Sequence, residues 1–113
     1  MGTPSTLSIE RFEVQQRAHA FTTLAGALPR PPQPHRELGE NFLRATQAIQ
    51  TSIEKAAGRR DGAFSYGVAR GAAVQATTHI ECYRCLRVIQ PSQYQAAMAL
   101  LRPLVATLTR LAR

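Results

Sequence analysis

The sequence is poor in the residues that build most binding and catalytic sites. It has no tryptophan, aromatic residues make up 6% of the chain, and there are only two cysteines. The core of a 113-residue chain of this kind has to be built from leucine, isoleucine, valine and alanine, which suits helices. No stretch reaches the roughly 18 apolar residues of a membrane span, and the first residues lack the apolar core of a signal peptide. We therefore expect a cytoplasmic protein.

Acidic residues are also scarce, and none follows Glu81. The chain has 14 basic and 7 acidic residues, for a net charge of +7. A basic surface attracts polyanions, although it can also be a solvated face that only keeps a protein soluble. We predict phosphate-driven, non-specific binding of RNA or DNA, because few aromatic residues are available to stack on bases. The arginines predicted to bind nucleic acid are Arg44, Arg59, Arg60, Arg84, Arg87, Arg102 and Arg110.

No β-like alternation persists, and four segments repeat apolar residues at helical spacing instead. The prolines of "LPRPPQPHR" separate the first two helices, and Gly58 is a plausible cap for the second. Ser92 followed by Gln95 has capping-box spacing at the start of the fourth helix, inside which Pro103 should produce a kink. Short connections favour an all-α, antiparallel up-down-up-down four-helix bundle in a single domain, residues 1–113. The helices are predicted at about 7–28, 37–57, 61–89 and 92–112.

Three of these helices have one apolar stripe each, which we expect to face the core. The stripes are Val14, Ala18, Phe21, Ala25 and Leu28; Leu38, Phe42, Ala45, Ile49, Ile53 and Ala56; and Tyr94, Ala97, Leu101, Leu104, Leu108 and Leu111.

The third helix differs, because it has two apolar rows. The main stripe is Phe64, Val68, Gly71, Gln75, Thr78, Cys82, Cys85 and Ile89. The second row is Ala69, Ala73, Ala76, Ile80 and Tyr83. Apolar residues on two sides of a helix in so small a domain indicate a subunit interface as well as a core. We predict that the second row forms the interface of a homo-oligomer.

The stretch "GRRDG" lies between the second and third helices. It has two glycines but no GxGxxG or GxxxxGK[ST] pattern, so it does not indicate a phosphate-binding loop. We interpret it as the corner between two helices, with Asp61 as the N-cap of the third. Arg59 and Arg60 would then project from an exposed turn, where phosphates could reach them.

No catalytic or metal-binding motif is present. His79, Cys82 and Cys85 include zinc-ligand types, but positions i and i+6 diverge by about 120° around a helix, and there is no second cysteine pair. Both cysteines lie within the predicted helix, whereas thiol redox chemistry favours a helix N-terminus. No ExxH pair or GxSxG elbow occurs. We predict no enzymatic activity, no cofactor and no metal, with a thiol or metal site at Cys82 and Cys85 as the least favoured alternative.

Several loose motifs resemble one superfamily of four-helix-bundle proteins. They are "VQQRAHAF", "LPRPPQPHRELGENFLR", "AGRRDGAF", "ARGA" and "SQYQAAMALLRPLVATLTRL". The superfamily contains the proteins encoded in ribosomal RNA intervening sequences and the accessory variability determinant proteins of diversity-generating retroelements. Gln15 stands where many intervening-sequence members have tryptophan, and Gln75 where a glutamate is common, which moves the chain away from that branch.

The resemblance implies a barrel-like homopentamer with a basic surface and no catalytic site. In the retroelement branch it implies an accessory protein that binds a reverse transcriptase and the template RNA. The alternative is a structural scaffold that docks a protein partner and has no nucleic-acid role. Arginines gathered on one face or in a central pore favour nucleic acid, and arginines scattered over the surface favour the scaffold.

Overall fold

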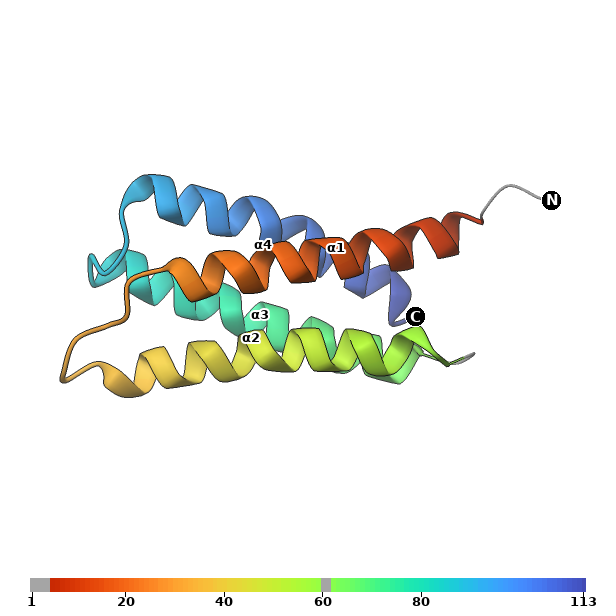
Figure 1. Ribbon diagram of the computed structural model, residues 1–113, viewed down its shortest axis with the longest axis horizontal. Coiled ribbons are helices and arrows are strands. Elements are labelled where there is room, and N and C mark those ends of the chain that lie inside the picture. The colour runs from red at the N-terminus through yellow and green to blue at the C-terminus, as the bar shows by residue number, and fades with distance from the viewer. Residues whose placement is uncertain (1–4, 60–61) are drawn as a thin grey trace.

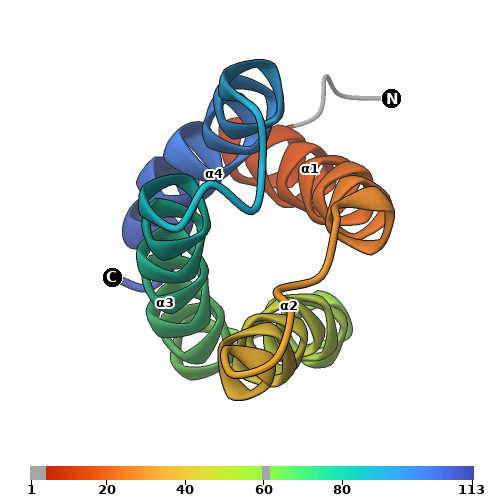
Figure 2. The same cartoon turned by 90° about the vertical axis from the view of Figure 1, so that its left-hand side faces the viewer.

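The computed structural model describes residues 5–59 and 62–113, which form four helices and no strand. Each helix runs antiparallel to the one before it (Figure 1). Both α1 and α3 contact α2 and α4, so the four helices surround one core (Figure 2). The predicted all-helical fold is confirmed, in a body of 54 × 24 × 19 Å. The helices are α1 (Thr6–Ala27), α2 (Arg36–Ala57), α3 (Ala63–Cys85) and α4 (Pro91–Leu111).

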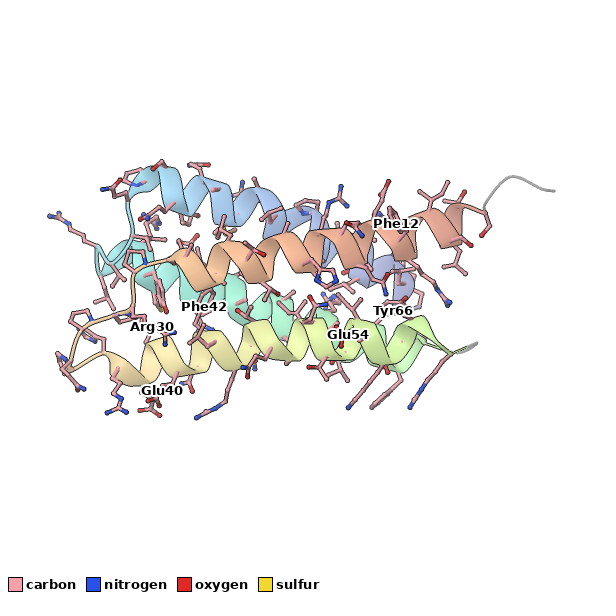
Figure 3. All side chains as sticks on the ribbon, viewed as in Figure 1. Phe12, Arg30, Glu40, Phe42, Glu54 and Tyr66 are labelled. Atoms are coloured by element: carbon pink, nitrogen blue, oxygen red, sulfur yellow. The ribbon has the colours of Figure 1, made fainter. Side chains whose placement is uncertain are left out.

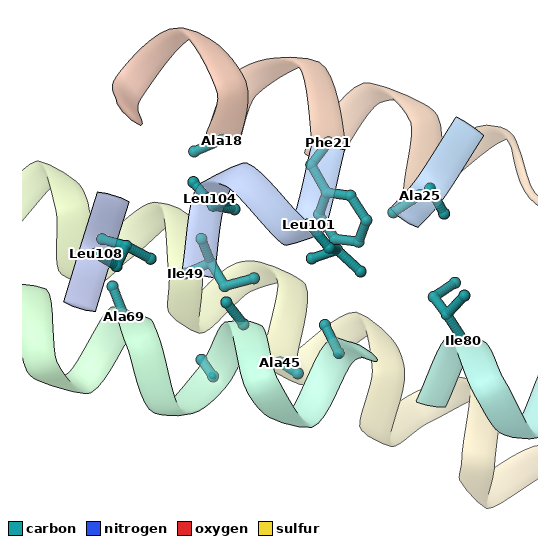
Figure 4. Close-up of a cluster of buried hydrophobic side chains, with 14 of the residues drawn as sticks. Ala18, Phe21, Ala25, Ala45, Ile49, Ala69, Ile80, Leu101, Leu104 and Leu108 are labelled. Carbon is teal, nitrogen blue, oxygen red and sulfur yellow. The ribbon is translucent and has the colours of Figure 1, made fainter. Parts of the chain in front are cut away.

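The core is built from the stripes predicted for α1, α2 and α4. All of their residues are buried except Leu38 and Tyr94, which are half-buried. Leucines of α4 meet Phe21 of α1 and Ile49 of α2 across the centre of the bundle (Figure 4). The predicted core stripes of these three helices are therefore confirmed.

The two apolar rows of α3 lie on the opposite faces from those predicted. Phe64 is 82% exposed and Val68 is 46% exposed, so the start of the main stripe faces solvent. The predicted interface row is instead inside the bundle, with each side chain at most 2% exposed. These residues are Ala69, Ala73, Ala76, Ile80 and Tyr83. They pack within one chain, and their assignment to a contact between copies is corrected to core.

The physical reason for this arrangement is side-chain size. Alanine adds only a Cβ atom to the helix surface, so a row of alanines lets α3 lie close to its neighbours. In α2, Ala45 and Ala56 are also buried in the same cluster. A phenylalanine in that row would have to fit where only a methyl group is accommodated, which is costly in a close-packed core.

The third helix ends at Cys85, four residues before the predicted end. The N–H of Val88 donates to the carbonyl of Tyr83 at 2.9 Å, and the N–H of Arg87 donates to that of Arg84 at 3.0 Å. This pair of bonds is the Schellman motif, in which the residue after the cap adopts a left-handed conformation. That residue is Arg87, with φ of 59°. The chain then turns toward α4.

The other helix ends agree more closely with the prediction. Gly58 caps α2 as expected, while Asp61 lies outside the described residues. At the start of α4 the capping box is formed by Gln90 and Gln93, not by Ser92 and Gln95. The predicted pair is two residues too late because Pro91 already occupies the first helical turn, where its missing N–H costs nothing.

The connection between α1 and α2 packs closely on α2. A Cβ atom on residue 39 would lie 2.9 Å from Cδ of Pro31, so glycine is required for this approach. Pro31 is buried there, and the linker covers one end of the α2–α3 pair.

Candidate nucleic-acid interface

A surface seam runs along the line where α3 packs against α4. Residues spaced by four and three face each other from the two antiparallel helices. At one end, Nε of Arg70 donates a hydrogen bond to Oγ1 of Thr109 at 2.8 Å. At the other end, Oη of Tyr94 donates to Oε1 of Glu81. The α3–α4 seam consists of Arg70, Val74, Thr77, Glu81 and Arg84 from α3, and Tyr94, Met98, Arg102, Val105 and Thr109 from α4.

The middle of the seam is a shallow groove of about 330 Å³. Its floor is apolar, formed by Val74, Met98 and Val105, and Arg102 stands at its edge. Arg70 and Arg84 lie 14 residues apart on α3, which is almost four helical turns and about 21 Å along the axis. The two arginines therefore point to the same side, with Arg102 from α4 between them.

Positive charge is concentrated in this half of the bundle. Residues 62–113 contain six arginines and one carboxylate, Glu81. Residues 5–59 contain seven basic and five acidic residues, so charge there is nearly balanced. Among the described residues, no carboxylate lies within ion-pair distance of Arg70, Arg87 or Arg102. These three guanidinium groups are available to an anion.

The one carboxylate of this half is engaged by its neighbours. Nε and Nη2 of Arg84 donate to Oε2 of Glu81 at 3.2 and 2.9 Å, while Tyr94 donates to the other oxygen. The hydrogen bond from Tyr94, followed by that from Arg84, lowers the pKa of Glu81. The same bond raises the pKa of Tyr94. The guanidinium of Arg84 also lies over the Tyr94 ring, with Cζ 5.2 Å from the centroid.

A cavity of about 650 Å³ opens beside this cluster, at the corner between α3 and α4. Arg84 and Arg87 supply its charge, and Ile89 and Pro91 its apolar wall. Its lining is completed by Gln90, Tyr94 and Gln95. Arg87 adopts a left-handed backbone conformation, with positive φ, which most L-residues avoid.

We expect that replacing Arg87 with glycine stabilises the fold. Glycine adopts a positive φ without the steric cost that a side chain carries, and Arg87 makes no ion pair with a described carboxylate that would be lost. The expected gain in the free energy of unfolding is about 0.5–1 kcal/mol. Chemical denaturation followed by circular dichroism measures it. Arg87→Ala is the matched control, since alanine keeps the strained conformation, and an equal gain for alanine would show that relief of charge repulsion is the cause.

Of the arginines predicted to bind nucleic acid, Arg84, Arg87 and Arg102 lie together on the seam or at its corner. Arg59 follows the end of α2, at the opposite end of the bundle from Arg84. Arg110 lies near the same end of the bundle as Arg59. It forms an ion pair with Glu10 of α1, with Nε 3.2 Å from Oε2. Arg60 lies outside the described residues. The predicted set is therefore divided between both ends and two sides of the molecule.

Arg44 lies on a different face, in a groove of about 640 Å³ between α2 and α3. Its Nη1 donates to Oδ1 of Asn41 at 3.1 Å. His79 also lines this groove, its ring edge-on to Phe42, and burial lowers its pKa. The Nδ1 atom of His79 is buried without a hydrogen-bond partner among the described residues. This groove is polar but holds a single arginine.

Arg70 is not among the arginines predicted from the sequence to bind nucleic acid. Its spacing to Arg84 was the available signal, because residues 14 apart lie on one face of a helix. The spacing alone does not indicate a binding site. It does so in the structure because α4 places Arg102 between Arg70 and Arg84.

The histidine and cysteines of α3 do not form a ligand set. Cys82 is half-buried and Cys85 is exposed, and both thiols are free. Within residues 5–59 and 62–113, no three histidine, cysteine or acidic side chains lie close enough together to hold a metal ion.

No helix in the described part of the chain has the length and apolar character needed to cross a membrane. No protein-family model matches the chain, and the search of curated proteins finds no similar sequence.

Proposed function

We propose that this protein is a non-enzymatic nucleic-acid-binding protein whose α3–α4 seam contacts the sugar–phosphate backbone. The observation that carries the proposal is the row of Arg70, Arg102 and Arg84 along one seam, in a half of the bundle with a single carboxylate. Arg87 extends this row at the corner. Because Glu81 already pairs with Arg84, the phosphate contacts belong to Arg70, Arg102 and Arg87. Guanidinium groups bind phosphates with paired hydrogen bonds, so this row suits a polyanionic strand.

The row reads phosphates and not base sequence. Its length of about 21 Å corresponds to roughly six nucleotides at 3.4 Å per strand step. The floor between the arginines consists mainly of valine and methionine, which offer no hydrogen bonds to base edges. The hydroxyl of Thr77, which also lines the groove, already donates to the carbonyl of Ala73. Contacts to phosphates fix position but carry no sequence information. Binding is therefore expected to tolerate any base sequence along the groove.

The assembly and the protein partner form part of the same proposal. We propose a cytoplasmic homopentamer that serves a reverse transcriptase, on the strength of the motifs that resemble the retroelement accessory proteins. Since the alanine row of α3 is buried within one chain, contacts between copies have to use other surfaces.

A scaffold that docks a protein partner is the second candidate function. Large apolar side chains are exposed near the first turns of α1 and α3, among them Phe12 at 61% and Phe64 at 82%. Exposed apolar groups of this kind favour a protein contact. This candidate requires no arginine row.

A salt titration of the unaltered protein tests the proposal. We expect a labelled single-stranded RNA to bind with an affinity that falls linearly in a plot of log K against log salt. With three phosphate contacts, at Arg70, Arg87 and Arg102, and about 0.7 for each, the slope should be about −2 for each engaged chain. Fluorescence anisotropy gives the affinity, and size-exclusion chromatography with light scattering gives the number of chains. Absence of binding at low salt, or a slope near zero, would contradict the proposal and favour the scaffold.

A further inference from the structure

The guanidinium of Arg84 is held as a fixed flat surface. Two hydrogen bonds to one oxygen of Glu81 fix its orientation, and its Cζ atom lies over the Tyr94 ring, 5.2 Å from the centroid. Tyr94 is itself held by its hydrogen bond to Glu81. The Arg84 side chain remains 50% exposed, so part of it is open to a ligand. A planar group can therefore stack on this oriented guanidinium, as bases do on arginine planes.

The cavity beside Arg84 has the size and lining of a small-molecule site. Its volume of about 650 Å³ lies within the range usual for such sites. Ile89 and Pro91 form an apolar wall, and Gln90, Tyr94 and Gln95 complete the lining. Because Glu81 offsets the charge of Arg84, the positive charge available in the cavity is that of Arg87. The cavity thus combines a flat stacking surface, an apolar wall and one unpaired cation.

We propose that this corner cavity binds a nucleotide, with the base stacked on Arg84 and the phosphate held by Arg87. The inference rests on the proposed function in one respect, since the nucleotide is either free or a unit of the strand that follows the seam. Arg87 keeps a strained backbone conformation at a position where glycine is preferred, which is consistent with a role for its side chain. Gln95, which also lines the cavity, carries an amide that can bond the edge of the base.

Binding of three probes to the full chain tests this inference. The probes are adenosine 5′-monophosphate, ribose 5-phosphate and inorganic phosphate, titrated by calorimetry and by NMR of the amide groups. We expect the nucleotide to bind at least about 10-fold more tightly than ribose 5-phosphate, which lacks the base. Equal affinities for these two probes would overturn the proposal, because stacking on Arg84 would then contribute nothing.

Two variants test the separate roles of the arginines. Arg84→Lys keeps the charge and the pairing with Glu81 but removes the planar face, so the preference for the nucleotide should fall to about twofold or less. Arg87→Gln should weaken binding of the nucleotide and of ribose 5-phosphate by a similar factor, roughly fivefold, because only the phosphate contact is lost. Arg44→Lys, in the groove between α2 and α3, is the matched control and should leave the preference unchanged. A preference that survives Arg84→Lys would overturn the proposal.

A competition experiment separates the two sources of the nucleotide. Displacement of a single-stranded RNA by excess nucleotide supports binding of a strand unit in the cavity. Simultaneous binding of both supports a free nucleotide ligand. If the nucleotide does not bind while the RNA retains its salt-dependent affinity, this inference fails and the proposed function remains.

Discussion

Replacing Arg70, Arg87 and Arg102 together with glutamine should weaken binding of a single-stranded RNA by about 100-fold at about 0.1 M salt. Each phosphate contact to a single strand contributes about 0.7 to the slope of log K against log salt. Three lost contacts reduce the slope by about 2. Counterion release no longer favours binding near 1 M salt, which is one decade above 0.1 M, so the affinity lost at 0.1 M is about two powers of ten. Anisotropy titrations at several salt concentrations measure both the affinity and the slope. All three side chains lie on the surface, so thermal unfolding should be little changed.

A second triple variant removes the same charge from elsewhere. Arg30, Arg44 and Arg59 are exposed, and none has an ion-pair partner among the described carboxylates. Changing these three to glutamine should cost less than about fivefold in affinity, since they lie outside the seam. If both triple variants lose affinity equally, binding depends on net charge alone, and the assignment to the α3–α4 seam is wrong.

Replacing Phe42 with alanine should lower the free energy of unfolding by about 3–5 kcal/mol. Phe42 is 1% exposed and lies in the second turn of α2, toward the end of the bundle that carries the α1–α2 connection (Figure 3). Its ring meets Phe21 of α1 edge-on, with centroids 6.1 Å apart, and Tyr83 of α3 at 5.1 Å. Truncation removes both contacts and leaves a cavity that helices can only partly close. Urea denaturation followed by circular dichroism measures the loss.

Phe12 provides a control of the same residue type. It is 61% exposed on α1, so Phe12→Ala should change the free energy of unfolding by no more than about 0.5 kcal/mol. Equal losses for the two variants would mean that Phe42 is not a core residue. A large loss for Phe12→Ala that depends on protein concentration would instead show that Phe12 is covered by a second copy.

Periodicity predicted the helices because three of them bury one stripe each. In α1, the steps from Val14 to Phe21 to Leu28 are multiples of a helical turn, and all three side chains are buried. The prediction failed for α3 because both of its faces carry apolar residues. Hydrophobicity favours placing Phe64 in the core, whereas packing places alanines there and leaves Phe64 exposed.

The candidate site was predicted only in part. Arg84, Arg87 and Arg102 were selected from the absence of acidic residues after Glu81, and this asymmetry is retained in the structure. Arg110 was selected on the same ground but is paired with Glu10, while Arg44, selected from the basic surface, and Arg59, selected from the exposed turn, lie on other faces. Net charge does not indicate on which face of the fold an arginine lies, so composition alone does not distinguish arginines of the seam from the rest.

By itself, the amino-acid sequence determined four helices, the approximate positions of their breaks, and an excess of basic over acidic residues in the second half of the chain. These properties depend on neighbours along the chain, on proline and glycine, and on a helical repeat of 3.6 residues. Tertiary structure alone decided which face of α3 is buried, because that depends on the space left by α2 and α4. It also decided that Arg102 stands between Arg70 and Arg84, since the register of two antiparallel helices is set by packing and not by either helix alone.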